Sequence, residues 1–293
     1  MSLAKYKIFI SVVETGSLTK AAQTLGCTQS AVSHSIDSLE NELGFALLKR
    51  GRGGMRLTSE AEQLMPALRN LLNSAEQLDQ TASSIRGLDS GTVRIGAFTS
   101  VAVHWLPPIL KEFQQDYPRV EFKLLNGDYH DVEQWLSGGS VDIGFVNMPC
   151  RLECETIALM EDRLLAILPL NSRFASYPRF PLVECETEPF ISLLESSDHD
   201  ARRALEAAGV KPNVRFYTKD DYAILAMVEQ GLGMTITHSL IANNPRYNVV
   251  CKRFDRGQYR DIAIATAKNA RLAGTTKLFV EHVISQISGS QEK

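Results

Sequence analysis

The chain has 293 residues, of which 44% are hydrophobic and 22% charged, and its formal net charge is −3. This length exceeds one typical domain core, so we expect two or three folded domains. No stretch approaches the roughly 18 consecutive apolar residues of a membrane helix, and the first residues meet a polar cluster too early for a secretory signal. We therefore expect a cytoplasmic protein that has no membrane partner.

The five cysteines are too few and too scattered to define a scaffold. Their number is odd and they form no CxxC pair: Cys27, Cys150, Cys154, Cys185 and Cys251. The sequence therefore predicts no disulfide framework, no metal site and no cofactor other than a small-molecule ligand, and most cysteines are expected to be reduced core residues.

The first predicted elements are two short amphipathic helices around a tight turn. Ser17 can cap the first helix and Gly26 can end it, while Thr28 and Gly44 are suited to the same positions in the second. Apolar residues recur at helical spacing on one face of each: Leu18, Ala21, Ala22 and Leu25, then Val32, Ile36, Leu39 and Leu43.

The opposite face of the second helix suits base edges and phosphates. It carries short or planar hydrogen-bonding groups: Gln29, Ser30, Ser33 and His34. A lone helix of this kind is more often a solvated surface helix, but the small-residue turn before it favours a helix-turn-helix that enters the major groove.

A basic Gly-rich loop follows the second helix. It has no acidic residue between Glu42 and Glu60, and its four cations are Lys49, Arg50, Arg52 and Arg56. Residues 1–58 carry a net charge of +3, although the whole chain is acidic, so the basic excess lies at the proposed DNA end. The expected DNA contacts are Ser17, Thr28, Gln29, Ser30, Ser33, His34, Arg50 and Arg52.

A long helix is predicted from Ser59 to about residue 86. Apolar residues alternate at intervals of three and four along it, which is the pattern of a coiled-coil seam. Ser59 and Glu62 can form a capping box at its start. The alternative is a helix packed on its own domain, but we favour dimerisation, with a seam that contains Leu64, Leu68, Leu71, Leu78 and Ile85.

From residue 92 the pattern changes to alternating strands and helices. TVRIGAF, VEFKLLNG and VDIGFVN read as strands, with a helix of Val103 to Gln115 and another through Val132 between them. A second set follows, with strands RLLAILP, PFISLL, VRFYT and GMTIT and helices from about Asp198 and from Asp220. The strand DIAIATA and a C-terminal helix complete the chain. This order predicts parallel α/β sheets in two similar lobes.

These segments resemble the LysR-type transcriptional regulators. The match to the winged helix-turn-helix of that family is dense at Phe9, Val13, Gly16, Ser17, Leu18, Ala21, Ala22, Leu25, Gln29, Val32, Ser33, Ile36, Leu39, Glu40, Leu43, Gly44, Leu47, Arg50, Leu57 and Thr58. SVDIGFVN and MVEQGLGMTI match the family's effector-binding domain more loosely. Four positions depart from its pattern: Ser30 replaces a usual proline, Leu48 a phenylalanine, Glu62 a glycine and His238 a proline.

The resemblance implies three parts. Residues 1–58 form an all-α winged helix-turn-helix that binds promoter DNA, and 59–88 a linker helix that pairs two chains, with two dimers often joining. Residues 91–290 form a two-lobed α/β domain that resembles periplasmic binding proteins. Lobe I covers about 91–161 and 268–290, and lobe II about 162–267. RNA polymerase is a further expected partner.

By the same resemblance, a small-molecule effector binds between the lobes, at the carboxyl ends of the strands. Thr99 and Ser100 fit this place best, since their hydroxyls and the following helix could hold an organic anion. Residues that end other predicted strands complete the expected wall: Gly127, Asn147, Ser196, Ser197, Tyr217 and Thr237. His238 is more often a solvated or capped strand end than a cleft residue. Some regulators of this family sense oxidants, but the spacing of Cys150 and Cys154 matches no redox signature.

Two other classes of function compete with a regulator. Two α/β lobes could form an enzyme, but the sequence has no GxSxG, Walker, HExxH or strand-following GxGxxG motif, so we expect no catalytic residue. An exported small-molecule binding protein is opposed by the missing signal sequence and by the basic N-terminal module. We therefore predict a sequence-specific DNA-binding transcription regulator that responds to an effector.

Overall fold

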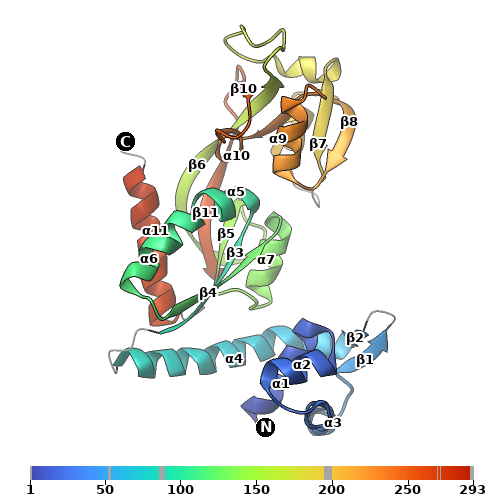
Figure 1. Cartoon of the computed structure of the whole chain (residues 1–293), viewed down its shortest axis with the longest axis vertical. Helices are drawn as coiled ribbons and strands as arrows, with labels where there is room; N and C mark the ends of the chain where they lie inside the picture. The colour runs from blue at the N-terminus through green and yellow to red at the C-terminus, as the bar shows by residue number, and fades with distance from the viewer. Residues whose placement is uncertain are drawn as a thin grey trace. The chain divides into compact units, whose positions relative to one another are not determined.

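The structure, a computed structural model, describes residues 2–51, 54–85, 90–194, 200–268, 270 and 272–290. The chain divides into two compact units (Figure 1). One comprises Met1–Leu88 with Gly138–Ser140, and the other Asp89–Ser137 with Val141–Lys293. Each unit is described by itself.

The N-terminal unit is a helical domain with a β-hairpin. Its elements are α1 (Leu3–Thr15), α2 (Leu18–Leu25), α3 (Gln29–Leu43), the strands β1 (Leu48–Gly51) and β2 (Gly54–Leu57), and α4 (Ser59–Ile85). Residues of α1, α2, α3 and the start of α4 share one core, in which Phe9, Val12, Val32 and Leu39 are almost fully buried. The predicted fold class of this part, helix-turn-helix plus long linker helix, is confirmed.

The ends of the helices follow the predicted capping residues. The side chain of Ser17 accepts a hydrogen bond from Lys20 N at the start of α2, and Thr28 accepts one from Ala31 N at the start of α3. Gly26 and Gly44 end the two helices with φ of 64° and 82°, the left-handed region that glycine adopts without a steric penalty.

The predicted N-cap of α4 is wrong by one residue, and Thr58 takes the place expected for Ser59. Thr58 Oγ1 accepts the hydrogen bond from Ala61 N at 3.2 Å, while Ser59 Oγ donates to the neighbouring Glu60 carboxylate. Thr58 also donates to the carbonyl of Ala46 at 2.8 Å, so the same hydroxyl joins the helix start to the segment before β1.

The second unit contains a central mixed sheet. The strands β3 (Gly91–Ala97), β4 (Val120–Asn126) and β5 (Ile143–Met148) are parallel, as the sequence predicts. The first half of β6 (Cys154–Pro169) and all of β11 (Tyr259–Ala267) join this sheet antiparallel, in the order β6-β11-β5-β3-β4. Residues 259–267 therefore extend the first sheet, and grouping them with lobe II was incorrect.

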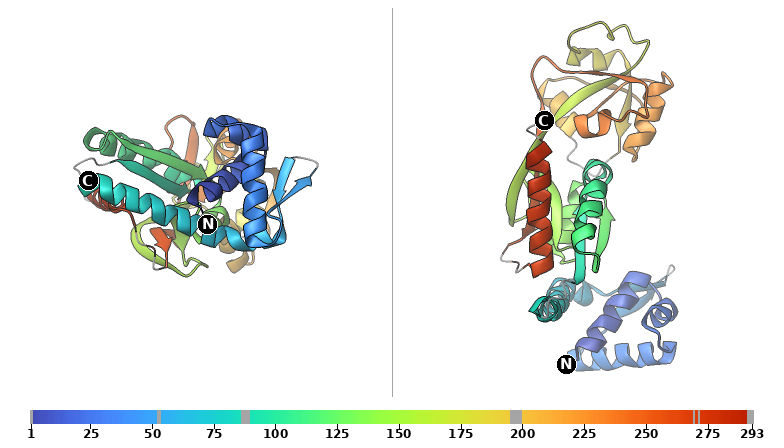
Figure 2. Two further views of the ribbon diagram at one scale, coloured as in Figure 1. Left: turned by 90° about the horizontal axis from the view of Figure 1, so that it is seen from below. Right: turned by 60° about the vertical axis from the view of Figure 1, so that its left-hand side comes forward.

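Helices cover both faces of this sheet. On one face α5 (Thr99–His104), α6 (Leu106–Asp116) and α11 (Gly274–Ser290) enclose a core with Val93, Ile95, Phe113 and Phe279. Figure 2 shows α11 running along the sheet. On the other face α7 (Tyr129–Ser137) packs on β5 and β11. The predicted helix of Val103 to Gln115 is in fact two helices that meet at Trp105, and Pro107 lies in the first turn of the second, where proline is tolerated.

The second half of β6 runs on into lobe II. There it pairs antiparallel with β9 (Thr235–His238) and β10 (Val249–Lys252), while β7 (Pro189–Leu193) and β8 (Asn213–Thr218) form a separate parallel pair. A 3-10 helix (Leu182–Glu186), α8 (Asp200–Ala207), α9 (Asp221–Glu229) and α10 (Ser239–Ala242) surround these strands. Lobe II is thus only partly parallel, because β6 supplies one long antiparallel strand to both lobes.

Candidate functional sites

The polar face of α3 is available for contact. Val32, Ile36 and Leu39 lie in the core, which fixes the rotation of the helix about its axis. The opposite residues Gln29, Ser30 and His34 are exposed, and Ser33 is half-buried. Ser30 Oγ lies 3.1 Å from Thr28 Oγ1, so the Ser30 hydroxyl extends the hydroxyl cap of the helix.

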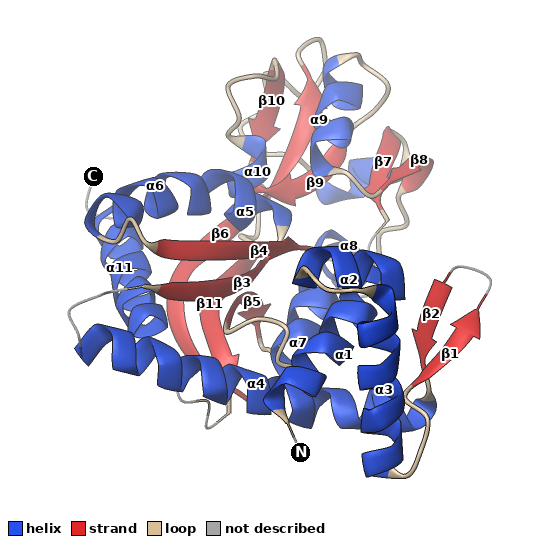
Figure 3. Cartoon of the chain, turned by 60° about the horizontal axis from the view of Figure 1, so that its bottom comes forward, coloured by secondary structure: helices blue, strands red, loops and turns tan. Residues whose placement is uncertain are grey.

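The β1–β2 hairpin, which we call the wing, is attached to α3 by a single carboxylate. Glu40 Oε1 accepts hydrogen bonds from Leu47 N at 2.6 Å and Leu48 N at 3.2 Å. Figure 3 shows the wing strands. Lys49 pairs with Arg56 and Arg50 with Met55 across the hairpin, so three cations occupy its two strands. Arg52, a predicted phosphate contact, lies outside the described residues.

Gly54 joins the wing to the turn between α1 and α2. Its φ is 118°, and a Cβ added there would lie 2.6 Å from the carbonyl oxygen of Gly16. The same carbonyl accepts a hydrogen bond from Met55 N at 3.0 Å. Only glycine permits this close approach of the two backbones.

The predicted seam of α4 divides into two parts. Leu64 and Leu68 pack in the core of their own unit, and Leu68 is only 3% exposed. Leu71, Leu78 and Ile85 are 46%, 70% and 83% exposed. The first two residues therefore act in folding, which was the alternative explanation, while the later three form an uncovered apolar row.

In the second unit, a cavity of about 440 Å³ that is open to solvent lies between the two lobes. Its polar lining comes from α5, the β4–α7 connection, α8, α9, β9 and β11. The lining residues are Phe98, Thr99, Ser100, Gly127, Tyr129, Leu193, Asp200, Asp221, Ile236, Thr237, His238, Ile241 and Arg260. Its position at the carboxyl ends of β3 and β4 is the one expected for a ligand site in an open α/β sheet.

A buried arginine forms the floor of this cavity. Arg260 is 5% exposed and binds Asp162, which is fully buried, with Nη2 and Oδ2 2.6 Å apart. Arg260 also donates to Ser100 Oγ at 2.6 Å and to the hydroxyl of Tyr129 at 2.8 Å. Its guanidinium lies 4.6 Å from the centre of the Phe98 ring. Burial lowers the pKa of Arg260, but the neighbouring Tyr129 and Asp162 outweigh it, so the pKa is raised and the charge is permanent.

Asp162 also connects this floor to lobe II. Its Oδ1 accepts hydrogen bonds from Ser239 Oγ at 2.6 Å and from Leu240 N at 3.2 Å, at the start of α10. The buried ion pair therefore has its remaining acceptors occupied, as a buried charge requires.

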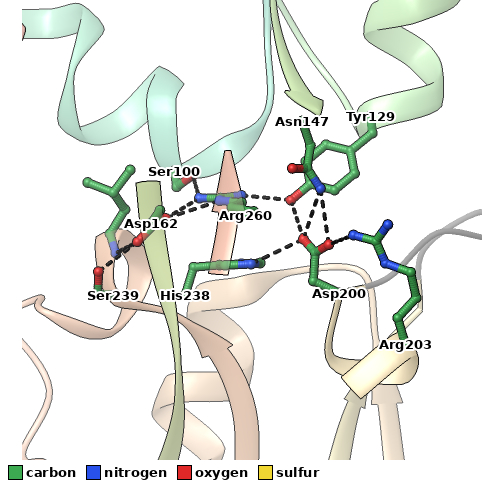
Figure 4. A network of polar contacts seen from close by, with 10 residues as sticks. Ser100, Tyr129, Asn147, Asp162, Asp200, Arg203, His238, Ser239 and Arg260 are labelled. Atoms are coloured by element: carbon green, nitrogen blue, oxygen red, sulfur yellow. Dashed lines mark hydrogen bonds and ion pairs between the residues drawn. The ribbon is translucent and has the colours of Figure 1, made fainter. Parts of the chain in front are cut away.

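A second polar cluster surrounds Asp200 (Figure 4). The hydroxyl of Tyr129 donates to Asp200 Oδ2 at 2.8 Å, Asn147 Nδ2 lies 3.0 Å from Oδ1, and Arg203 forms an ion pair with it. His238 Nε2 is 3.1 Å from Oδ2. Burial raises the pKa of Asp200, but His238, Tyr129 and Arg203 together hold it well below its usual range. Burial, with the charge of Arg260, lowers the pKa of His238.

Asp221 has a different environment. It lines this cavity and the two spaces that adjoin it. Burial raises the pKa of Asp221 to about 6, against the opposing charge of Arg260 and a hydrogen bond with the Thr99 side chain. The carboxylate belongs to the first turn of α9, whose N-cap is the neighbouring Asp220.

Four of the eight residues expected at the effector site line the cavity: Thr99, Ser100, Gly127 and Thr237. Asn147 lies behind them and holds Asp200. Tyr217 does not belong to the lining and is 65% exposed, because its strand end faces solvent. Ser196 and Ser197 lie outside the described residues. Ser100 and Thr99 start α5, and Ser100 Oγ is already engaged by Arg260.

The charged residues of the cavity were not identified from the sequence. Arg260 lies one residue before the predicted strand DIAIATA, and Asp200 and Asp221 begin helices at positions where an acid is an ordinary helix start. A solvated strand end was the favoured prediction for His238, and it is wrong, because His238 is 8% exposed and lines the cavity. Arg260 and Asp162 each have a charged neighbour in the sequence, Asp261 and Arg163, so no local pattern marks either residue as buried.

The cysteines give no support to redox chemistry. The structure describes all five as free thiols, but the expectation that most are core residues is wrong, because only Cys185 is buried while Cys27 and Cys251 are exposed. Burial raises the pKa of Cys185 and of Cys150 to about 12, and thiols held protonated in this way react slowly.

Among the described residues, no helix is long and apolar enough to cross a membrane, and no cluster of ligands suits a metal ion.

Two protein families match this chain. A model described as "Bacterial regulatory helix-turn-helix protein, lysR family" matches residues 3–62, and one described as "LysR substrate binding domain" matches residues 86–288. Together the two matched regions cover most of the chain, and residues 63–85, which form most of the linker helix, lie between them.

Individual proteins and structures agree with these models. The uncharacterized HTH-type transcriptional regulator YvbU of Bacillus subtilis is 32% identical over 287 residues, which are 96% of this chain and 97% of YvbU. The structure of HinK, a LysR family transcriptional regulator from Pseudomonas aeruginosa, has 26% identity and a TM-score of 0.60 over 98% of both chains. Full-length CbnR complexed with its target DNA has a TM-score of 0.68 over 98% of this chain and 100% of CbnR. At 21% sequence identity, the similarity to CbnR shows a shared fold and nothing more.

Proposed function

The chain belongs to the LysR family of DNA-binding transcriptional regulators with an effector-binding domain, and we propose that it reads promoter DNA as a dimer under the control of a small molecule. The family is one of regulators and not of enzymes. The orientation of α3 supports sequence-specific reading most directly. Its apolar face packs in the core, so its polar face is exposed to solvent.

The DNA contacts proposed for α3 and the wing have different roles. Gln29, Ser33 and His34 present side chains that suit base edges, so they determine sequence preference. Arg50 lies on the wing strand and suits a phosphate beside the groove, and a phosphate contact adds affinity on every sequence. Full-length CbnR has been solved with its target DNA, and its fold is similar to that of this chain.

We propose that Leu71, Leu78 and Ile85 pair with the same residues of a second copy. These three side chains leave an apolar row on the solvent side of α4 at coiled-coil spacing, which a soluble helix rarely exposes without a partner. Two α3 helices held by one such seam would read two half-sites, and a further pairing would give a dimer of dimers.

The effector is proposed to occupy the cavity between the lobes. Two buried polar clusters from both lobes border it, around Arg260 and around Asp200, so a ligand there would contact both lobes at once. A regulator of promoters acts where the DNA and RNA polymerase are, so we place this protein in the cytoplasm and expect contact with the polymerase.

The salt dependence of DNA binding tests the proposed surface. We expect Arg50→Ala to weaken binding of the full-length protein to any duplex and to reduce the slope of log K against log[salt] by about 1. The control is Arg215→Ala, which removes an equal charge from an exposed strand of the second unit. Equal losses of DNA affinity in the two variants would mean that binding depends only on the net charge of the protein. The wing would then not be the DNA-binding surface.

A further inference from the structure

The cavity's arginine is already saturated with partners. Four of the five N–H groups of a guanidinium are used by Arg260, on Asp162, Ser100 and Tyr129. The charge is balanced by Asp162, which is fully buried. An anionic ligand would therefore meet a neutral ion pair in place of a free cation, and to bind Arg260 it would have to compete with the Asp162 carboxylate.

Asp200 is balanced in the same way. Arg203 forms its ion pair, and Tyr129 and Asn147 donate hydrogen bonds to its two oxygens. Both strong charges at the base of the cavity are thus satisfied within the protein.

Asp221 is the exception in this lining. The charge of Arg260 and a hydrogen bond from Thr99 lower its pKa, but no lysine or arginine of the described residues forms an ion pair with it. A largely buried carboxylate that has no ion-pair partner is costly in free energy. It is mostly ionised at neutral pH, because its pKa of about 6 is below 7.

The space that adjoins the cavity is also acidic. It has a volume of about 850 Å³, includes open solvent, and shares Thr99, Gly127 and Asp221 with the cavity. Asp128 and Asp131 line it and accept hydrogen bonds from each other's backbone N–H, and the exposed Lys219 is its cation. The balance of charge around Asp221 therefore favours a positively charged ligand.

We propose, on the premise that this cavity holds the effector, that the effector is a small organic cation whose ammonium or guanidinium group binds Asp221. The apolar residues Leu193, Ile236 and Ile241 line the same cavity and would contact a short carbon chain. Thr99 orients the carboxylate from the other lobe, so binding at Asp221 engages both lobes. This replaces the organic anion that the sequence suggested.

The test uses probes of similar chain length and different charge. Binding of pentylammonium, agmatine, pentanoate and 1-pentanol to the full-length protein is measured by calorimetry at neutral pH. We expect at least one of the two cations to bind at least about tenfold more tightly than pentanoate and pentanol. We expect Asp221→Asn to weaken cation binding by about tenfold or more, and Asp255→Asn, an exposed acid, to leave it unchanged.

Three results would overturn this proposal. Pentanoate could bind more tightly than the other probes, or neither cation could bind at millimolar concentration. The third result is that Asp221→Asn binds the cations with the same affinity as the wild-type protein. Thr99→Val serves as a second variant, because it keeps the carboxylate and removes its hydroxyl partner, and it should weaken cation binding less than Asp221→Asn does. DNA binding is measured separately, so a protein that binds cations through Asp221 but ignores DNA would refute the proposed function and leave this site standing.

Discussion

Ser33 and His34 face away from the core of the N-terminal unit on the helix proposed to read bases. We expect Ser33→Ala and His34→Ala to change the preferred sequence in a randomised-site selection, with a loss of about 1–3 kcal/mol of discrimination at the affected base. Ser35→Ala is the matched control, because the Ser35 hydroxyl donates to the carbonyl of Ala31 at 2.8 Å within the same helix. An identical preference in wild type and both variants would exclude these two residues as base readers.

Asp221 should make the stability of the free protein depend on pH. Burial raises its pKa from about 3.8 to about 6, so the folded protein binds this proton more tightly than the unfolded chain does. The contribution of Asp221 to the free energy of unfolding therefore falls as pH rises between these two values. Partial exposure reduces the effect, and we expect Asp221→Asn to be about 1–2 kcal/mol more stable than wild type at neutral pH.

Urea unfolding near pH 4 and near pH 7 measures this difference. The gain of Asp221→Asn should disappear at the lower pH, where the wild-type carboxyl is protonated. Asp255→Asn should show no such dependence. If Asp221→Asn is less stable than wild type at both values, the carboxylate is a structural partner of groups around it and not an uncompensated charge.

At the scale of residues, sequence patterns predicted the caps and buried stripes of the N-terminal helices better than the lining of the cavity. Caps and apolar stripes depend on neighbours within a few positions, so Ser17, Thr28 and Val32 could be assigned from local spacing. Arg260 and Asp162 meet across strands that are far apart in the chain, and Asp200 depends on His238 and Tyr129 from other elements. Nothing in local spacing predicts which partner a buried charge has.

The contact of the wing with the turn between α1 and α2 depends on Gly54. We expect Gly54→Ala to destabilise the N-terminal unit by about 1–3 kcal/mol, because the added Cβ meets the Gly16 carbonyl and the backbone has a positive φ. Gly51→Ala is the control in the same hairpin, since its Cβ would meet only the side chain of Arg56, at 3.2 Å. Thermal unfolding of the two variants compares them, and equal midpoints would contradict the close approach.

The exposed half of α4 is expected to carry the dimer. Leu78→Glu places a charge in the apolar row, and we expect it to weaken association by at least about tenfold in sedimentation experiments. Gln77→Glu adds the same charge one residue earlier, on a different side of the helix, and should leave association intact. A wild-type protein that sediments as a monomer, or a Leu78→Glu variant that associates normally, would exclude this seam.

Element boundaries show where sequence patterns succeed and fail. The period of the linker helix was read correctly, but periodicity alone could not separate Leu68, which packs in its own unit, from Leu78, which does not. Likewise the alternation of strands and helices indicated an α/β domain, whereas the antiparallel pairing of β6 and β11 follows from long-range contacts. A strand pattern does not reveal its direction relative to distant neighbours.

At the scale of the whole molecule, control of DNA binding requires a difference in ligand affinity. A ligand that bound two arrangements of the lobes equally would shift neither. Contacts that join the lobes around the cavity supply such a difference: Thr99 with Asp221, Tyr129 with Asp200, and the Tyr222 hydroxyl 2.9 Å from His104 Nε2. A bound molecule that separates or strengthens these contacts changes the relative free energy of the arrangements.

Capture of fragmented genomic DNA by the purified full-length protein, repeated across salt concentrations and followed by sequencing, tests the central claim most directly. The account predicts enrichment of one motif with two half-sites separated by one or more helical turns, and a steep loss of captured DNA as salt increases. Recovery of no sequence above the input at low salt would contradict the assignment of this protein as a sequence-specific regulator.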